Sequence, residues 1–148
     1  MWNAKKSVLL SLIFTRIVMV LVVGVAVLAP KMVEAYLEYT SKGAEGFGLL
    51  LGTIYVCCVL ALVALFSLDR LLTNIRMSHV FLEGNVRYLR RLSWCCFLAA
   101  LVLLPAAFSA QGLFVVVVAA GFIGLILRVV KNVIEEAVIL KSENDLTI

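Results

Sequence analysis

The chain has 148 residues, of which 64% are hydrophobic and 15% charged, and thirteen basic against nine acidic residues give a net charge of +4. A soluble domain is closer to half apolar and about a quarter charged. Together with a mean hydropathy of +1.14, these values exclude a soluble enzyme, a disordered regulator and a secreted disulfide scaffold. The composition therefore predicts a small integral membrane protein.

Apolar runs of membrane-spanning length occur along the whole chain. A helix needs roughly 20 mostly apolar residues to cross a hydrocarbon core of about 30 Å. The last run, 92–127, is long enough for two crossings, and a turn at 108–112 divides it just after Pro105. The runs do not alternate as the strands of a barrel would. The sequence therefore predicts an all-α membrane protein, a single domain with four transmembrane helices at about 8–30, 47–68, 92–108 and 113–130, a loop at 69–91 and a tail at 131–148.

The basic residues predict the orientation. With four crossings, eleven of the thirteen fall on one side of the membrane, and the exceptions are Lys31 and Lys42. Lysines and arginines near short loops are retained in the cytoplasm. Both termini and the 69–91 loop should therefore be cytoplasmic.

The cytoplasmic segments carry helical patterns of their own. Leu68, Leu71, Leu72 and Ile75 have the i, i+3, i+4, i+7 spacing of a helix, which predicts that the second helix continues to about Arg76. A turn at 77–80 follows, and the next helix should begin near 83–85. The tail presents one apolar stripe, made of Val130, Val133, Ile134, Ala137 and Val138. Neighbouring helices, a second copy of the chain, the lipid surface or a soluble partner could cover this stripe.

The arginines of the loop have two interpretations. They could set the orientation and attract anionic headgroups, which contributes on the order of 1 kcal/mol each, or they could form a docking surface for an acidic partner. Direct binding of nucleic acid is not expected, because the arginines lie against the bilayer and no recognition-helix motif is present.

Three segments carry a resemblance to a known family. LLTNIR at 71–76 and VFLEGNVRYLRR at 80–91 resemble the cytoplasmic loop of the YoaS-like family of small bacterial four-span membrane proteins, a domain of unknown function, and ENDLTI at 143–148 resembles its terminal motif. Gly84 departs from the family pattern, which usually has a second acidic residue there.

The resemblance implies a multi-pass protein of the bacterial cytoplasmic (inner) membrane with no established activity. Members of the family are often encoded beside a small helix-turn-helix regulator. This association implies a membrane-bound regulator or anchor for a transcription factor, or a sensor of membrane or ligand state.

The candidate partner-binding residues lie in the loop and the tail. Glu143 and Asp145 could also pair with the loop arginines, although single exposed ion pairs contribute little. The candidates are Arg76, Phe81, Glu83, Asn85, Arg87, Arg90, Arg91, Glu143, Asn144 and Asp145.

Arg16 is an intramembrane charge. About ten residues past Lys6, it could lie roughly 15 Å deep, or it could extend to the headgroups from a helix that begins at the interface. None of the acidic residues lies inside a predicted span, so a deep Arg16 would need carbonyls, hydroxyls or an anion as its partner.

The cysteines Cys57, Cys58, Cys95 and Cys96 form two adjacent pairs. The pairs should lie at different depths, so neither a metal nor another cofactor is expected, and buried thiols are common. Small residues four apart, Gly48 with Gly52 and Ala120 with Gly124, permit close helix packing. Neither catalytic residues nor a phosphate-binding loop can be identified, so an enzyme is not expected.

The alternative function is a small transporter or channel. Proton-coupled export normally needs a carboxylate inside the membrane, which the predicted spans lack. Transport of an anion past Arg16 is the form of this alternative that the sequence does not exclude.

Overall fold

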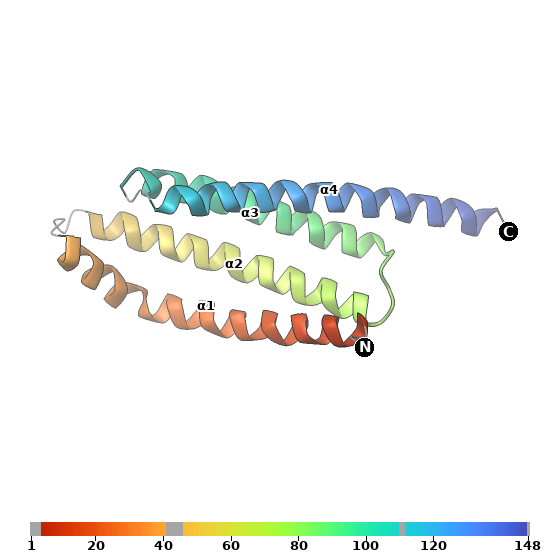
Figure 1. The fold of residues 1–148 in the computed structure, drawn as a ribbon, viewed down its shortest axis with the longest axis horizontal. Coiled ribbons are helices and arrows are strands. Elements are labelled where there is room, and N and C mark those ends of the chain that lie inside the picture. The colour runs from red at the N-terminus through yellow and green to blue at the C-terminus, as the bar shows by residue number, and fades with distance from the viewer. Residues whose placement is uncertain (1–3, 41–45, 110–111, 148) are drawn as a thin grey trace.

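Four long helices make up the computed structural model, which describes residues 4–40, 46–109 and 112–147. They are α1 (Ala4–Thr40), α2 (Phe47–Arg76), α3 (Glu83–Ser109) and α4 (Leu113–Leu146) (Figure 1). Each helix is long and apolar enough to cross a membrane. The predicted all-α class with four membrane-spanning helices is therefore confirmed.

The helices pack in chain order as an open row. α1 packs on α2, α2 on α3 and α3 on α4, and no other pair of the described helices packs extensively. The connection between α2 and α3 lies at the same end of the molecule as the start of α1, and α4 extends past it (Figure 1). We call this end the loop end, and the end where α1 and α3 finish the hairpin end. α1 and α4 are thus the two edges of the row.

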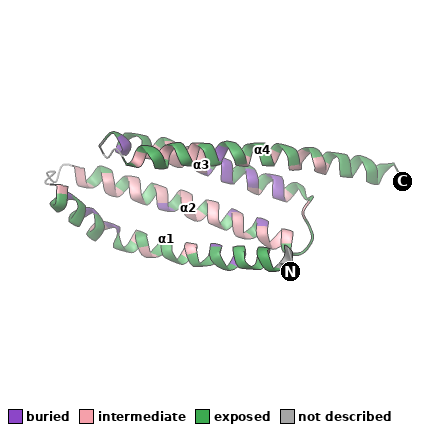
Figure 2. Cartoon of the chain, viewed as in Figure 1, coloured by how far each residue is buried: buried purple, intermediate pink, exposed green. Residues whose placement is uncertain are grey.

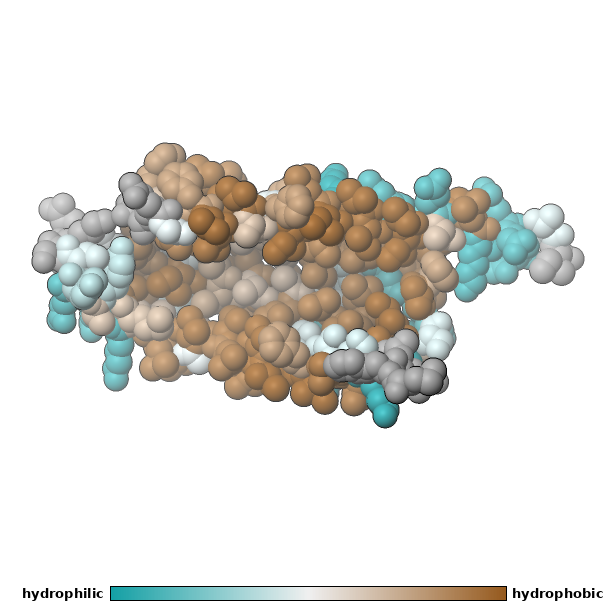
Figure 3. Space-filling model, in the orientation of Figure 1, coloured by the Kyte–Doolittle hydropathy of each residue, from teal (hydrophilic) through white to brown (hydrophobic). Residues whose placement is uncertain are grey.

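The distribution of apolar and polar residues on the surface is typical of a protein that lies in a lipid bilayer. A broad apolar band covers the middle of the molecule and polar residues gather toward its ends, above all on the part of α4 that projects from the loop end (Figure 3). Buried residues are few, and α3, which packs against helices on two sides, has more of them than any other helix (Figure 2). The apolar side chains outside this core face the hydrocarbon, where their exposure is favourable.

The loop-end boundaries agree with the sequence patterns, whereas α1 is longer than its apolar run. α2 ends at Arg76 and α3 begins at Glu83. α1 continues through Pro30 to Thr40, across residues that were expected to form a connection. Proline removes one helical hydrogen bond and favours a bend, and α1 bends in its second half (Figure 1). Val33 and Leu37, one turn apart, are buried beyond the proline and stabilise the added turns.

The closest helix contact joins α3 to α4. The Ser93 hydroxyl donates a hydrogen bond of 2.9 Å to the carbonyl of Gly124. A Cβ at Gly124 would lie 3.2 Å from the Phe97 ring, so the missing side chain permits the approach. A Cβ at Gly48 or Gly52 would meet no atom within 4 Å, so these two glycines are not needed for close packing within the chain.

Candidate functional site

Asn85 organises the connection between α2 and α3. It is 1% exposed, and its Nδ2 donates hydrogen bonds of 2.8 Å to the carbonyls of His79 and Val80. Its Oδ1 accepts a bond of 2.7 Å from Nδ2 of Asn74. Ser78 has a positive φ of 63°, which turns the chain back toward α3. One buried amide therefore holds the connection and the end of α2 in one geometry.

This burial corrects one predicted site residue. We expected Asn85 on a partner-binding surface, but its side chain lies inside the protein and its hydrogen-bonding groups are used within the loop. From the sequence alone, a polar residue at the start of a helix can equally be an exposed partner-binding residue or a buried residue that bonds within the loop. In this structure the Asn85 side chain holds the connection from inside and is not part of the exposed surface.

Most of the predicted loop residues are exposed. Arg87 and Arg91 lie one turn apart on α3, on the same side of the helix. Among the described residues, no carboxylate oxygen lies within 4 Å of the charged nitrogens of Arg76, Arg87 or Arg91. We call these three the free arginines. The exposed candidates of this region are Arg76, Phe81, Glu83, Arg87, Arg90 and Arg91.

Arg90 instead belongs to an ion cluster that joins α3 to α4. Its Nη2 lies 3.3 Å from Oε1 of Glu135, whose other oxygen accepts a 2.6 Å hydrogen bond from Nζ of Lys131. The hydrogen bond from Lys131 lowers the pKa of Glu135 below its usual value of 4.5, and the charges of Lys131 and Arg90 act in the same direction. The cluster lies where the projecting part of α4 leaves α3.

The tail residues do not meet the loop. Glu143, Asn144 and Asp145 are exposed at the end of α4, where the Thr147 hydroxyl donates to the carbonyl of Glu143 at 2.6 Å. The expected pairing of Glu143 or Asp145 with the loop arginines is not present, because α4 stays helical and carries them beyond the loop (Figure 1). The carboxylate that reaches Arg90 comes from Glu135, two turns earlier.

The projecting part of α4 also exposes apolar side chains. Of the predicted stripe, Ile134, Ala137 and Val138 are half-buried, whereas Val130 and Val133 are exposed. Ile139 and Leu140 are exposed on the same segment, at 53% and 61%. We call residues 131–146 the α4 extension.

Arg16 has a carboxylate partner that the sequence did not predict. Its Nε lies 3.0 Å from Oδ1 of Asp69 on α2, whose side chain is only 17% exposed. Asp69 directly follows the uncharged run of α2. From the sequence, carbonyls, hydroxyls or an anion were considered as partners of a deep Arg16, and Asp69 was not considered. The helical continuation of α2 that carries Asp69 was predicted, but its position beside Arg16 depends on how α1 and α2 pack. The ion pair joins α1 to α2 on the loop-end side of the apolar band.

In the part of the chain that the structure describes, the cysteines and the other metal-binding residue types form no cluster. All four cysteines are free thiols. Within residues 4–40, 46–109 and 112–147, no group of three or more His, Cys, Asp or Glu side chains could hold a metal ion.

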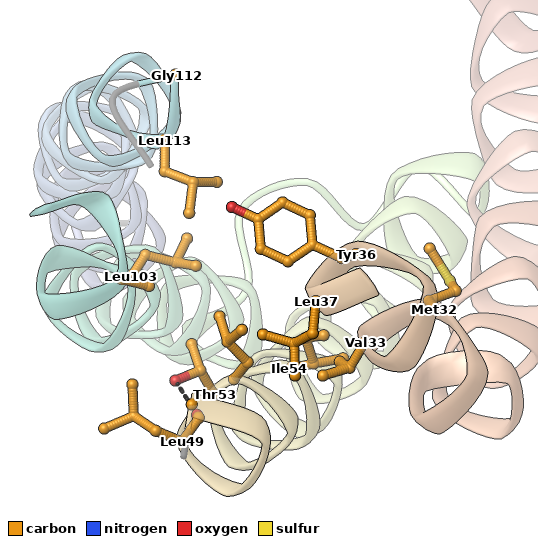
Figure 4. A pocket seen from close by; sticks show the side chains of 13 residues that line it. Met32, Val33, Tyr36, Leu37, Leu49, Thr53, Ile54, Leu103, Gly112 and Leu113 are labelled. Atoms are coloured by element: carbon orange, nitrogen blue, oxygen red, sulfur yellow. Dashed lines mark hydrogen bonds between the residues drawn. The ribbon is translucent and has the colours of Figure 1, made fainter. Parts of the chain in front are cut away.

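A pocket at the hairpin end was not predicted. It has a volume of about 630 Å³, and parts of all four helices line it. The Tyr36 side chain extends from α1 across it toward Leu103 and Leu113 (Figure 4). The pocket could not be predicted from the sequence, because residues 31–40 were expected to form a connection between two spans. Its lining residues are Met32, Val33, Tyr36, Leu37, Gly46, Leu49, Leu50, Thr53, Ile54, Leu103, Ala106, Gly112 and Leu113.

Comparison with known proteins identifies a family. The model of a family described as "Protein of unknown function (DUF2975)" matches residues 27–148, which include the pocket, the free arginines and the α4 extension, and exclude Arg16. Comparisons with curated proteins and with solved structures give no match. Because the match covers most of the sequence, the chain belongs to the DUF2975 family of proteins of unknown function.

Proposed function

We propose that the protein is a membrane-bound regulatory anchor whose loop end binds a soluble protein. One observation carries the proposal: three arginines without a carboxylate partner and the exposed apolar side chains of the α4 extension lie at the same end of the molecule. In this proposal the loop end faces the cytoplasm, as the distribution of basic residues favours, and the membrane is the bacterial inner membrane.

The geometry of the loop supports a docking role. Asn85 holds the connection between α2 and α3 with three hydrogen bonds, and the Arg90–Glu135 pair positions the α4 extension. A surface that is already ordered loses less conformational entropy on binding. The free arginines can therefore be presented to a partner in one arrangement.

The surface also defines the chemistry of the partner. Arginine side chains favour carboxylates on the partner, while Val133, Ile139 and Leu140 favour an apolar patch next to them. The helix-turn-helix regulator that the resemblance implies is our candidate, bound through its acidic surface rather than through its DNA-contacting helix. The proposal assigns no catalytic activity to the chain.

Co-purification from detergent-solubilised membranes with a co-expressed helix-turn-helix regulator of the kind that the resemblance implies tests the proposal. We expect Arg87→Gln/Arg91→Gln and, separately, Leu140→Ser to reduce the recovered regulator at least tenfold. Lys31→Gln, which removes an exposed charge near the opposite end of the molecule, is the matched control. Equal recovery with all three variants would overturn the docking assignment.

The small transporter or channel is a second candidate, and one observation favours it. Asp69 is a mostly buried carboxylate next to the apolar part of α2, although Arg16 already neutralises its charge. In proteoliposomes, proton-coupled flux of a test cation that disappears with Asp69→Asn would support transport. Flux equal to that of empty liposomes would argue against it.

A further inference from the structure

The pocket at the hairpin end lies at the depth of a lipid headgroup boundary. Tyr36 follows Arg16 by twenty residues on α1, which corresponds to about 30 Å of helix. This length along the helix is close to the thickness of the hydrocarbon core, and the bend in the second half of α1 makes the distance across the membrane somewhat shorter (Figure 1). With the Arg16–Asp69 pair near one boundary, Tyr36 lies at the other, where tyrosines are common. From the level of Tyr36 the pocket extends along α2 as far as Ile54, toward the middle of the apolar band.

The pocket is apolar apart from two hydroxyl groups. The Thr53 hydroxyl donates its hydrogen bond to the carbonyl of Leu49 at 2.8 Å, so it has no proton left to donate to a ligand. The Tyr36 hydroxyl projects from the ring toward Leu103 and Leu113, and side chains from the four helices surround the remaining space (Figure 4). This arrangement fits an amphiphile with an apolar chain and a hydrogen-bond acceptor at the boundary.

The surrounding medium identifies the amphiphile. An apolar space is not filled by water, which needs two to four polar partners. In a bilayer, the molecules that reach this depth are lipids, with their acyl chains in the hydrocarbon and their ester groups at the boundary. The volume of about 630 Å³ lies within the range of roughly 300–1,000 Å³ that is typical of ligand sites.

We propose that this pocket binds the ester-proximal part of one phospholipid acyl chain, and that the Tyr36 hydroxyl donates a hydrogen bond to its ester carbonyl. The lipid fills the space between the second half of α1 and the ends of α3 and α4, which do not pack extensively on α1. The site is at the opposite end from the proposed docking surface and does not depend on it.

Lipid retention tests the proposal. The protein is extracted from membranes of phosphatidylglycerol and phosphatidylethanolamine, washed in a mild detergent, and the bound lipid is identified by native mass spectrometry. We expect about one phospholipid per chain, at least a tenfold loss with Leu103→Trp, which fills the pocket, and a severalfold loss with Tyr36→Phe. Leu101→Trp, two residues away and 67% exposed, is the matched control and should retain the lipid.

Photo-crosslinking provides a measurement that needs no variant. Phosphatidylglycerol with a diazirine near the ester of its acyl chain is reconstituted with the wild-type protein and activated. We expect at least tenfold more adducts on Met32 and Ile54 than on the exposed Val20 and Val118. Uniform labelling, retention that Leu103→Trp leaves unchanged, or a free fatty acid as the retained species would each overturn the proposal.

Discussion

At the scale of single residues, the buried polar side chains explain how a mostly apolar chain reaches one defined structure. Asn85, Ser93 and Ser67 are the largest side chains with less than 2% exposure, and each makes a hydrogen bond within the protein. Apolar contacts between helices differ little from contacts with lipid, so they specify the packing only weakly. The bonds of Asn85 and Ser93 join different helices and depend on their register, whereas Ser67 bonds to a carbonyl of its own helix.

The first prediction concerns Asn85. Asn85→Ala leaves the carbonyls of His79 and Val80 without the donor that now satisfies them, and we expect a loss of about 1–3 kcal/mol in the free energy of unfolding. Limited proteolysis should show faster cleavage at residues 77–82. Asn132→Ala, at an exposed position of α4, is the control. Unchanged cleavage in Asn85→Ala would mean that the amide does not hold the connection.

The Arg16–Asp69 pair gives a prediction about depth. Arg16 is 64% exposed from the protein and Asp69 17%, which fits a pair at the membrane boundary. A double-mutant cycle with Arg16→Gln and Asp69→Asn should therefore give a coupling energy of about 1 kcal/mol or less, as for ion pairs in contact with water. The measurement is unfolding in mixed micelles. A coupling energy of several kcal/mol would instead place the pair in the hydrocarbon.

At the scale of helices, the sequence predicted those features that depend on local spacing. Leu68, Leu71, Leu72 and Ile75 follow one helical face, and α2 continues through them to Arg76 as expected. The extension of α1 beyond Pro30 could not be predicted in this way, because it depends on the burial of Val33 and Leu37 against other helices. The pocket could not be predicted for the same reason, because it is lined by residues from four separate segments.

Gly124 tests the packing of α3 on α4. Gly124→Leu should force the helices apart, because even its Cβ would lie 3.2 Å from the Phe97 ring and 3.3 Å from Cβ of Cys96. We expect about 1–3 kcal/mol of destabilisation. Gly121→Leu is the control on the same helix, since a Cβ there meets no atom within 4 Å. Thermal unfolding measures both, and equal effects would contradict the role of Gly124 in the contact.

The Arg90–Glu135–Lys131 cluster gives a pH prediction. The pKa of Glu135 is lowered, first by the hydrogen bond from Lys131. The folded state therefore gains stability that is fully present above 4.5, the usual pKa, and is lost as the pH falls through the lowered pKa. We compare the hydrogen-exchange rate of residues 128–140 in the wild type with the rate in Glu135→Gln at the same pH. The ratio of the two rates should rise only in this acidic range. A constant difference between the two proteins at every pH would exclude this linkage.

At the scale of the whole molecule, the sequence predicted the number of membrane crossings more accurately than the residues of the candidate binding surface. The apolar runs and the arginines are local features, and they gave four helices and one strongly basic end. Asn85 and the tail carboxylates were placed incorrectly, because burial and pairing depend on how helices distant in sequence meet. The open row that results has apolar edges at α1 and α4 and concentrates its unpaired charges at the loop end.

The last prediction tests the orientation of this row. In a cysteine-free background, His79→Cys lies in the exposed connection at the loop end and Tyr39→Cys lies at the hairpin end, where Tyr39 is 90% exposed. If the basic residues retain the loop end in the cytoplasm, a membrane-impermeant maleimide should label Tyr39→Cys in intact spheroplasts and His79→Cys only after the membrane is opened. The reverse pattern would place the free arginines outside the cell and remove any cytoplasmic partner. Labelling of both cysteines in intact spheroplasts would contradict the single crossing, by α2, that separates Tyr39 from His79, and with it the membrane topology on which both proposals depend.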